Sequence, residues 1–126
     1  MSKQNIFIGV VVGVVLMGIV LYFLLPDDTA LAQLPTGIVF YFGDTCPHCK
    51  NVEEYIIQNN VQDKILFEQK EVYNDAQNAK ELKVVAKACG IDPMKVGVPL
   101  LWNEGSCLVG DEDIITSFEE KINVQN

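Results

Sequence analysis

Residues Phe40–Cys49 read F-Y-F-G-D-T-C-P-H-C and join the end of a strand to the start of a helix. The apolar run Gly37–Phe42 is typical of a β-strand, and it leads into turn residues at Gly43–Thr45. Cys46 and Cys49 follow at the start of a helical pattern, where positions three apart face the same side. The sequence therefore predicts two neighbouring sulfurs at a helix N-terminus.

Cys46 is expected in the first helical turn, where unpaired backbone N–H groups and the helix dipole favour a thiolate over a thiol. Two sulfurs at this spacing can close a small disulfide ring, so we expect Cys46 and Cys49 to be a redox-active pair. Cys49 lies on the apolar stripe of the helix with Val52 and Ile56, whereas Cys46 is expected at the exposed tip. This asymmetry predicts that Cys46 attacks and Cys49 resolves.

Pro47 and His48 separate the two cysteines. Proline is tolerated in the first helical turn, where its missing N–H costs nothing. A positive charge on His48 would stabilise the Cys46 thiolate and therefore the reduced pair, which makes the disulfide a stronger oxidant. Pro47 and His48 are thus expected to tune the pair towards oxidation; the alternative is that His48 is only a solvated helix-start residue.

Other uses of this pair are a static structural disulfide and a metal site. A disulfide across three residues removes little chain entropy, which favours a redox role over a structural one. Zinc needs four ligands, and the cluster offers Cys46, Cys49 and His48. We therefore expect no metal, and no cofactor beyond the redox-active disulfide.

Residues Ile6–Leu25 form a run without a charged side chain, long enough to cross a bilayer once as a helix. Lys3 precedes the run and Asp27 and Asp28 follow it, so the positive-inside rule places the N-terminus in the cytoplasm and the rest of the chain outside. A cleaved signal peptide, giving a secreted form, is the alternative, because Ala30–Ala32 resembles a cleavage site. The length of the run favours an uncleaved membrane anchor.

The chain thus divides into a cytoplasmic N-terminus (1–5), a transmembrane anchor (6–25), a linker (26–36) and a globular domain (37–126). The chain carries a formal net charge of −8 at pH 7 and no arginine, which argues against a nucleic-acid partner and against docking on anionic lipid. Four cysteines in an extracytoplasmic domain fit an oxidising compartment.

The remaining patterns predict two helices and three strands. They are a strand at Ile65–Val72, a helix at Asp75–Ala88 with Asn74 as its N-cap, strands at Pro99–Trp102 and Cys107–Val109, and a helix that starts at Gly110 and Asp111. The resulting order, β-α-β-α-β-β-α, predicts an α/β domain with a small mixed sheet and helices on both faces.

Across about Gly37–Ile122, the chain resembles the thioredoxin superfamily, and in length its glutaredoxin-sized members. The likeness rests on C-P-H-C after a strand, on Val98 and Pro99 before a strand, and on Gly110 before the last helix. The Pro-His dipeptide is similar to that of periplasmic Dsb-type thiol oxidases. The resemblance implies a thioredoxin-like fold and a thiol–disulfide oxidoreductase, with protein substrates and a redox partner that resets the pair.

The resemblance also implies that the Val98–Pro99 peptide is cis and lies beside the disulfide, where the Val98 backbone would dock an extended substrate segment. Glutathione-using members have a basic residue before the motif and a Gly-Gly pair before the last helix. This chain has Asp44-Thr45 and Gly110-Asp111 there, which argues against glutathione use. It also lacks the helical insertion of Dsb-type oxidases, so oxidation and reduction of clients both remain open.

Cys89 lies on an apolar helix stripe, and Cys107 starts a strand. They either form a structural disulfide or are buried separately. The topology is expected to place the end of that helix near the active-site edge of the sheet and Cys107 near the other edge, so both alternatives remain open. For the whole domain, the alternatives to an enzyme are an interaction module with a static disulfide and a metal-delivery domain.

Overall fold

The computed structural model describes residues 2–24 and 34–124. Helix α1 spans Lys3–Leu24, and its segment Ile6–Phe23 is long and apolar enough to cross a membrane. An N-terminal apolar helix is therefore confirmed, and by length and composition it fits either a membrane span or a signal sequence. Leu25 and the predicted linker residues 26–33, with the Ala30–Ala32 motif, lie outside the described residues.

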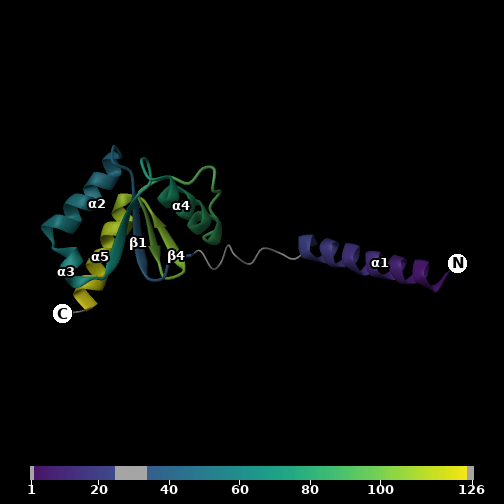
Figure 1. The fold of residues 1–126 in the computed structure, drawn as a ribbon. Helices are drawn as coiled ribbons and strands as arrows, with labels where there is room; N and C mark the ends of the chain where they lie inside the picture. The colour runs from purple at the N-terminus through teal and green to yellow at the C-terminus, as the bar shows by residue number, and fades with distance from the viewer. Residues whose placement is uncertain (1, 25–33, 125–126) are drawn as a thin grey trace.

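Four strands form one mixed sheet in the order β2-β1-β3-β4 (Figure 1). Strand β1 pairs in parallel with β2 and antiparallel with β3, and β3 pairs antiparallel with β4. The strands span Ile38–Phe42 (β1), Phe67–Glu71 (β2), Leu100–Asn103 (β3) and Ser106–Val109 (β4). Because β1 is an inner strand, the turn that follows it starts near the middle of the sheet, at one end of the strands.

The helices of the domain cover both faces of this sheet (Figure 1). They are α2 (Pro47–Gln58), α3 (Val61–Lys64), α4 (Ala76–Ala88) and α5 (Asp111–Val124). One core cluster joins α2, α3 and α5 to the sheet, and a second joins α4 to its other face. The predicted element order and α/β class are confirmed, with the short helix α3 as an addition.

Strand β1 supplies side chains to both clusters. Phe40 packs with α2 and α5, whereas Val39 and Tyr41 pack against α4, and all three are fully buried. Each such apolar side chain stabilises the fold by about 1.5–3 kcal/mol, so the strand that carries the cysteine turn is firmly held. Trp102 of β3 is also buried, and its Nε1 donates to the Pro35 carbonyl at 3.0 Å.

The predicted bounds of several elements differ from the observed ones by one or two residues. The N-cap of α4 is Asp75 and not Asn74, because the Asp75 carboxylate accepts from the backbone N–H groups of Gln77 and Asn78 at 2.9 and 3.0 Å. Strand β2 starts at Phe67 and not at the predicted Ile65, because the Ile65 N–H donates to the Val61 carbonyl of α3.

A disulfide joins Cys89 to Cys107, whose Cα atoms are 6.0 Å apart. Cys89 is the C-cap of α4, and Cys107 is the second residue of β4. Strand β2 is parallel to β1, so α4, which follows β2, begins near the end of the sheet at which β1 finishes. The helix then runs back to the opposite end of the strands, where β4 begins. The expected position of the helix end was therefore wrong, which is why the sequence left this pairing open.

Candidate redox site

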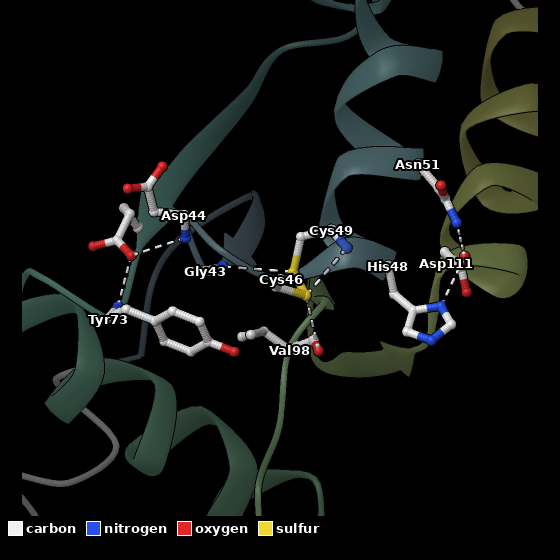
Figure 2. Close-up of a disulfide and its surroundings, with 10 residues drawn as sticks. Gly43, Asp44, Cys46, His48, Cys49, Asn51, Tyr73, Val98 and Asp111 are labelled. Carbon is white, nitrogen blue, oxygen red and sulfur yellow. Dashed lines mark hydrogen bonds and ion pairs between the residues drawn. A yellow bond between two sulfur atoms is a disulfide. The ribbon is translucent and has the colours of Figure 1, made fainter.

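The turn between β1 and α2 places a sulfur at a helix N-terminus (Figure 2). Helix α2 begins at Pro47, and Cys46 is its N-cap with an extended backbone. The Cys46 N–H donates to the Gly43 carbonyl at 3.0 Å, and the Cys46 Sγ accepts from the Cys49 N–H at 3.2 Å. The sulfur thus takes the position that a serine or aspartate oxygen takes in an ordinary helix cap.

Cys46 and Cys49 are joined in a disulfide, with their Cα atoms 5.2 Å apart. Cys49 is fully buried, and its Sγ lies 3.5 Å from the Gly43 N–H. Cys46 is 6% exposed, so the prediction of an exposed tip was wrong: the segment around Val98 covers this sulfur. Of the two cysteines, Cys46 is the one with some solvent exposure, whereas Cys49 has none.

The segment before β3 lies against the Cys46 sulfur. The Val98–Pro99 peptide is cis, as the resemblance implied, and Pro99 is buried. The Val98 carbonyl oxygen lies 3.6 Å from the Cys46 Sγ, so a reduced thiol there could donate to it. The Pro99 carbonyl accepts from the Gly110 N–H at 3.1 Å, which brings the start of α5 to the same place.

The side chain of His48 points towards α5 (Figure 2). Its Nδ1 lies 3.1 Å from the Asp111 Oδ2, and the Asn51 amide donates to the same oxygen at 2.6 Å. The bond from Asn51 and then the bond from His48 lower the pKa of the Asp111 carboxyl. Asp111 was not predicted as a site residue, because Glu112 and Asp113 share the acidic first turn of the last helix with it.

A second missed residue is Glu71, at the end of β2. Its carboxylate accepts from the backbone N–H groups of Asp44, Tyr73 and Asn74 at 3.2, 2.7 and 2.7 Å. Desolvation raises the pKa of Glu71, but these backbone hydrogen bonds outweigh it, and the net shift is downward. Glu71 therefore ties the turn before Cys46 to the loop after β2.

Tyr73 packs against the same turn. Its ring lies so close to Gly43 that a Cβ added there would overlap the ring (Figure 2). Only a glycine allows this approach. Together, Glu71 and Tyr73 fix the backbone that presents Cys46.

Among residues 2–24 and 34–124, no group of three or more His, Cys, Asp or Glu side chains is arranged to hold a metal ion.

No protein-family model matches the sequence, and a search of the curated proteins found no match. The structure resembles solved glutaredoxins. Wheat glutaredoxin matches with a TM-score of 0.53 and 20% identity over 80% of this chain and 92% of that chain. Oxidized glutaredoxin 2 from Chlamydomonas reinhardtii gives 0.50 and 17% over 79% and 87%.

A third similar structure is the buckwheat glutaredoxin–glutathione complex, with a TM-score of 0.51 and 12% identity over 79% of this chain and 84% of that chain. At such identities, the likeness concerns the fold. The chain therefore has a thioredoxin-like α/β fold similar to that of glutaredoxins, following an N-terminal apolar helix.

Proposed function

We propose that this chain is a thiol–disulfide oxidoreductase that exchanges disulfides with protein substrates through Cys46 and Cys49. One observation carries the proposal: the Cys46 sulfur caps helix α2, accepts from the Cys49 N–H at 3.2 Å and lies beside the Val98 carbonyl. The fold shared with solved glutaredoxins supports it.

In the oxidative direction, a substrate thiolate attacks the Cys46 Sγ. The Cys46–Cys49 bond breaks, a mixed disulfide with Cys46 forms, and Cys49 leaves as a thiolate that takes up a proton. A second substrate thiolate then attacks the substrate sulfur of the mixed disulfide and releases Cys46 as a thiolate. The substrate loses two electrons and two protons, and the pair gains the two electrons. A redox partner that also exchanges thiols and disulfides must then accept these two electrons.

In the reductive direction, the Cys46 thiolate attacks a substrate disulfide and forms a mixed disulfide. Cys49, once deprotonated, attacks the Cys46 sulfur and releases the substrate as a dithiol. The buried position of Cys49 suits this second, intramolecular step, because its sulfur needs to reach only Cys46.

The helix N-terminus supplies the reactivity. The Cys49 N–H and the dipole of α2 stabilise negative charge on the Cys46 sulfur, and Pro47 has no N–H at the first helical position, where such a group would lack a helical partner. The imidazole of His48, when protonated, adds positive charge to this end of the helix and tunes the pair. No cofactor besides the disulfide is required.

Val98 and Pro99 are proposed to dock the substrate. An extended segment that carries the reacting cysteine would pair with the Val98 backbone as an added strand. The 3.6 Å separation between the Val98 oxygen and the Cys46 Sγ supports this, because a peptide bonded to Val98 would hold its own sulfur near Cys46.

The substrates are proposed to be proteins and not glutathione. The buckwheat structure is a complex with glutathione. In this chain, Asp44 precedes the motif and the Asp111 carboxylate lies beside His48, so the acidic surroundings would repel the carboxylates of glutathione.

Helix α1 is proposed to anchor the domain in a membrane, with residues 1–5 in the cytoplasm and the domain outside. The apolar span, Lys3 before it and two disulfides in the domain support this placement. Fractionation and N-terminal sequencing test it. An intact N-terminus in the membrane fraction is expected, and a secreted chain that starts near Gln33 would contradict the anchor.

Reduction of insulin and oxidative refolding of a reduced client test the activity. The wild-type chain should turn over, Cys46→Ser should not, and Cys49→Ser should accumulate mixed disulfides through Cys46. A matched control is the pair Cys89→Ala and Cys107→Ala, which removes the other disulfide and should leave turnover intact.

Absence of turnover above background in a folded wild-type chain would refute the proposal and indicate an interaction module with a static disulfide. Stoichiometric copper or zinc that survives gel filtration would instead indicate metal delivery. Mixed disulfides trapped through Cys49 in Cys46→Ser, with none in Cys49→Ser, would reverse the two roles.

A further inference from the structure

A contact between the first turns of α2 and α5 stands next to the proposed redox pair. His48 is the second residue of α2, and Asp111 is the first residue of α5. The His48 Nδ1 lies 3.1 Å from the Asp111 Oδ2, and Figure 2 shows the ring turned towards this carboxylate. The side chain of the sequence's one histidine is thus held by a residue 63 positions away.

Asp111 is fixed from a second side as well. The Asn51 amide, one turn further along α2, donates to the same oxygen at 2.6 Å. The Asp111 side chain is 19% exposed, whereas that of His48 is 71% exposed. The bonds from Asn51 and His48 lower the pKa of Asp111, so its carboxylate is charged at neutral pH. A mostly buried carboxylate therefore holds an exposed ring.

We propose that Asp111 is a positioning residue that restrains the oxidising strength of the Cys46–Cys49 disulfide by holding His48 and offsetting its positive charge. This inference rests on the proposed thiol–disulfide exchange. Positive charge near Cys46 stabilises the thiolate and hence the reduced form. A carboxylate bound to the same imidazole opposes that field at the sulfur.

The consequence concerns the direction of electron flow. The dipeptide Pro47-His48 alone predicts a strong oxidant. When His48 is protonated, the sulfurs experience the field of its ion pair with Asp111 and not that of a free cation, so the disulfide is a weaker oxidant than its dipeptide predicts. Asp111 therefore shifts the pair towards reduction of clients.

The test is the equilibrium between the oxidised and reduced pair in the full chain, measured in glutathione and dithiothreitol redox buffers by trapping free thiols. Asp111→Asn keeps the side-chain size and an oxygen for Asn51 but removes the charge. The variant should favour the reduced pair by about two- to fivefold over wild type, a range set by the weak coupling of exposed charges.

Two controls distinguish an effect of the His48–Asp111 contact from a general effect of negative charge near the site. Asp113→Asn removes the same charge from the exposed face of the same helical turn and should shift the equilibrium less. In a His48→Ala background, Asp111→Asn should also shift it less, because the ring that Asp111 holds is gone. If Asp111 had only a structural role, Asp111→Asn would change the stability of the domain, but its effect on the redox equilibrium would not depend on His48.

The inference is overturned if Asp111→Asn leaves the equilibrium unchanged, favours the oxidised pair, or shifts it equally with and without His48. Equal shifts in Asp111→Asn and Asp113→Asn would also overturn it. If the wild-type pair does not equilibrate with either buffer, the proposed function fails and this inference with it. A wild-type pair that equilibrates normally leaves the proposed function standing whatever the variants show.

Discussion

The Glu71 carboxylate accepts a hydrogen bond from the Asp44 N–H at 3.2 Å, across 27 residues of sequence. Asp44 belongs to the turn that presents Cys46, and Glu71 ends the neighbouring strand β2. The same carboxylate also binds the N–H groups of Tyr73 and Asn74. The geometry of the candidate redox site therefore depends on one acidic side chain outside the Cys-x-x-Cys motif.

Glu71→Gln should lower the stability of the domain in a pH-dependent manner. Folding lowers the pKa of Glu71, so its ionised form contributes stability above the unfolded pKa of about 4.3, and this contribution is lost as the pH falls through the folded pKa. Urea midpoints of wild type and variant should differ at pH 7 and converge once the pH has fallen below the lowered pKa of Glu71 in the folded chain. Glu54→Gln, an exposed acid on α2, is the control and should leave the midpoint unchanged. A constant difference at all pH values would contradict this role of the charge.

Gly43→Ala should destabilise the domain by about 1–3 kcal/mol, because the new Cβ overlaps the Tyr73 ring. Tyr73→Ala in the same chain should recover part of the loss, so that the two changes are less than additive. Guanidinium unfolding of the single and double variants measures both. Gly97→Ala, where a Cβ meets no atom within 4 Å, is the matched control. Additive effects of the two changes would refute the overlap.

Replacing both Cys89 and Cys107 by alanine should cost about 2–4 kcal/mol of folding free energy, since the 18-residue separation closes a sizeable loop. The Cys89–Cys107 disulfide lies at the opposite end of the strands from Cys46, so the redox equilibrium of the Cys46–Cys49 pair should not change. Denaturant unfolding and redox titration of the same variant test both parts. A folded variant with an altered equilibrium would show that the two disulfides are coupled.

Local patterns were sufficient to predict most elements of the domain. The apolar run that includes Phe40 identified the central strand, and the spacing of Val52 and Ile56 after Cys49 identified the buried face of α2. The cis peptide before Pro99 followed from the family resemblance and not from the residues themselves.

What the sequence did not predict depends on contacts between distant segments. Asp111 and His48 are 63 residues apart, and no local pattern distinguishes this aspartate from the other acids of its helical turn. The pairing of Cys89 with Cys107 required the direction of α4 relative to β4, which depends on the parallel pairing of β1 with β2. The contact between the Cys46 sulfur and the Val98 carbonyl likewise joins positions 52 residues apart.

The cap position of Cys46 is expected to make its sulfur unusually acidic in the reduced chain. The pH dependence of alkylation of the reduced chain, with the modified residue identified by peptide mapping, measures this directly. Half-maximal reactivity of Cys46 is expected well below the pKa of about 8.5 of a free cysteine. Half-maximal reactivity at or above that pH would contradict the account, because the proposed exchange would then lack its reactive thiolate.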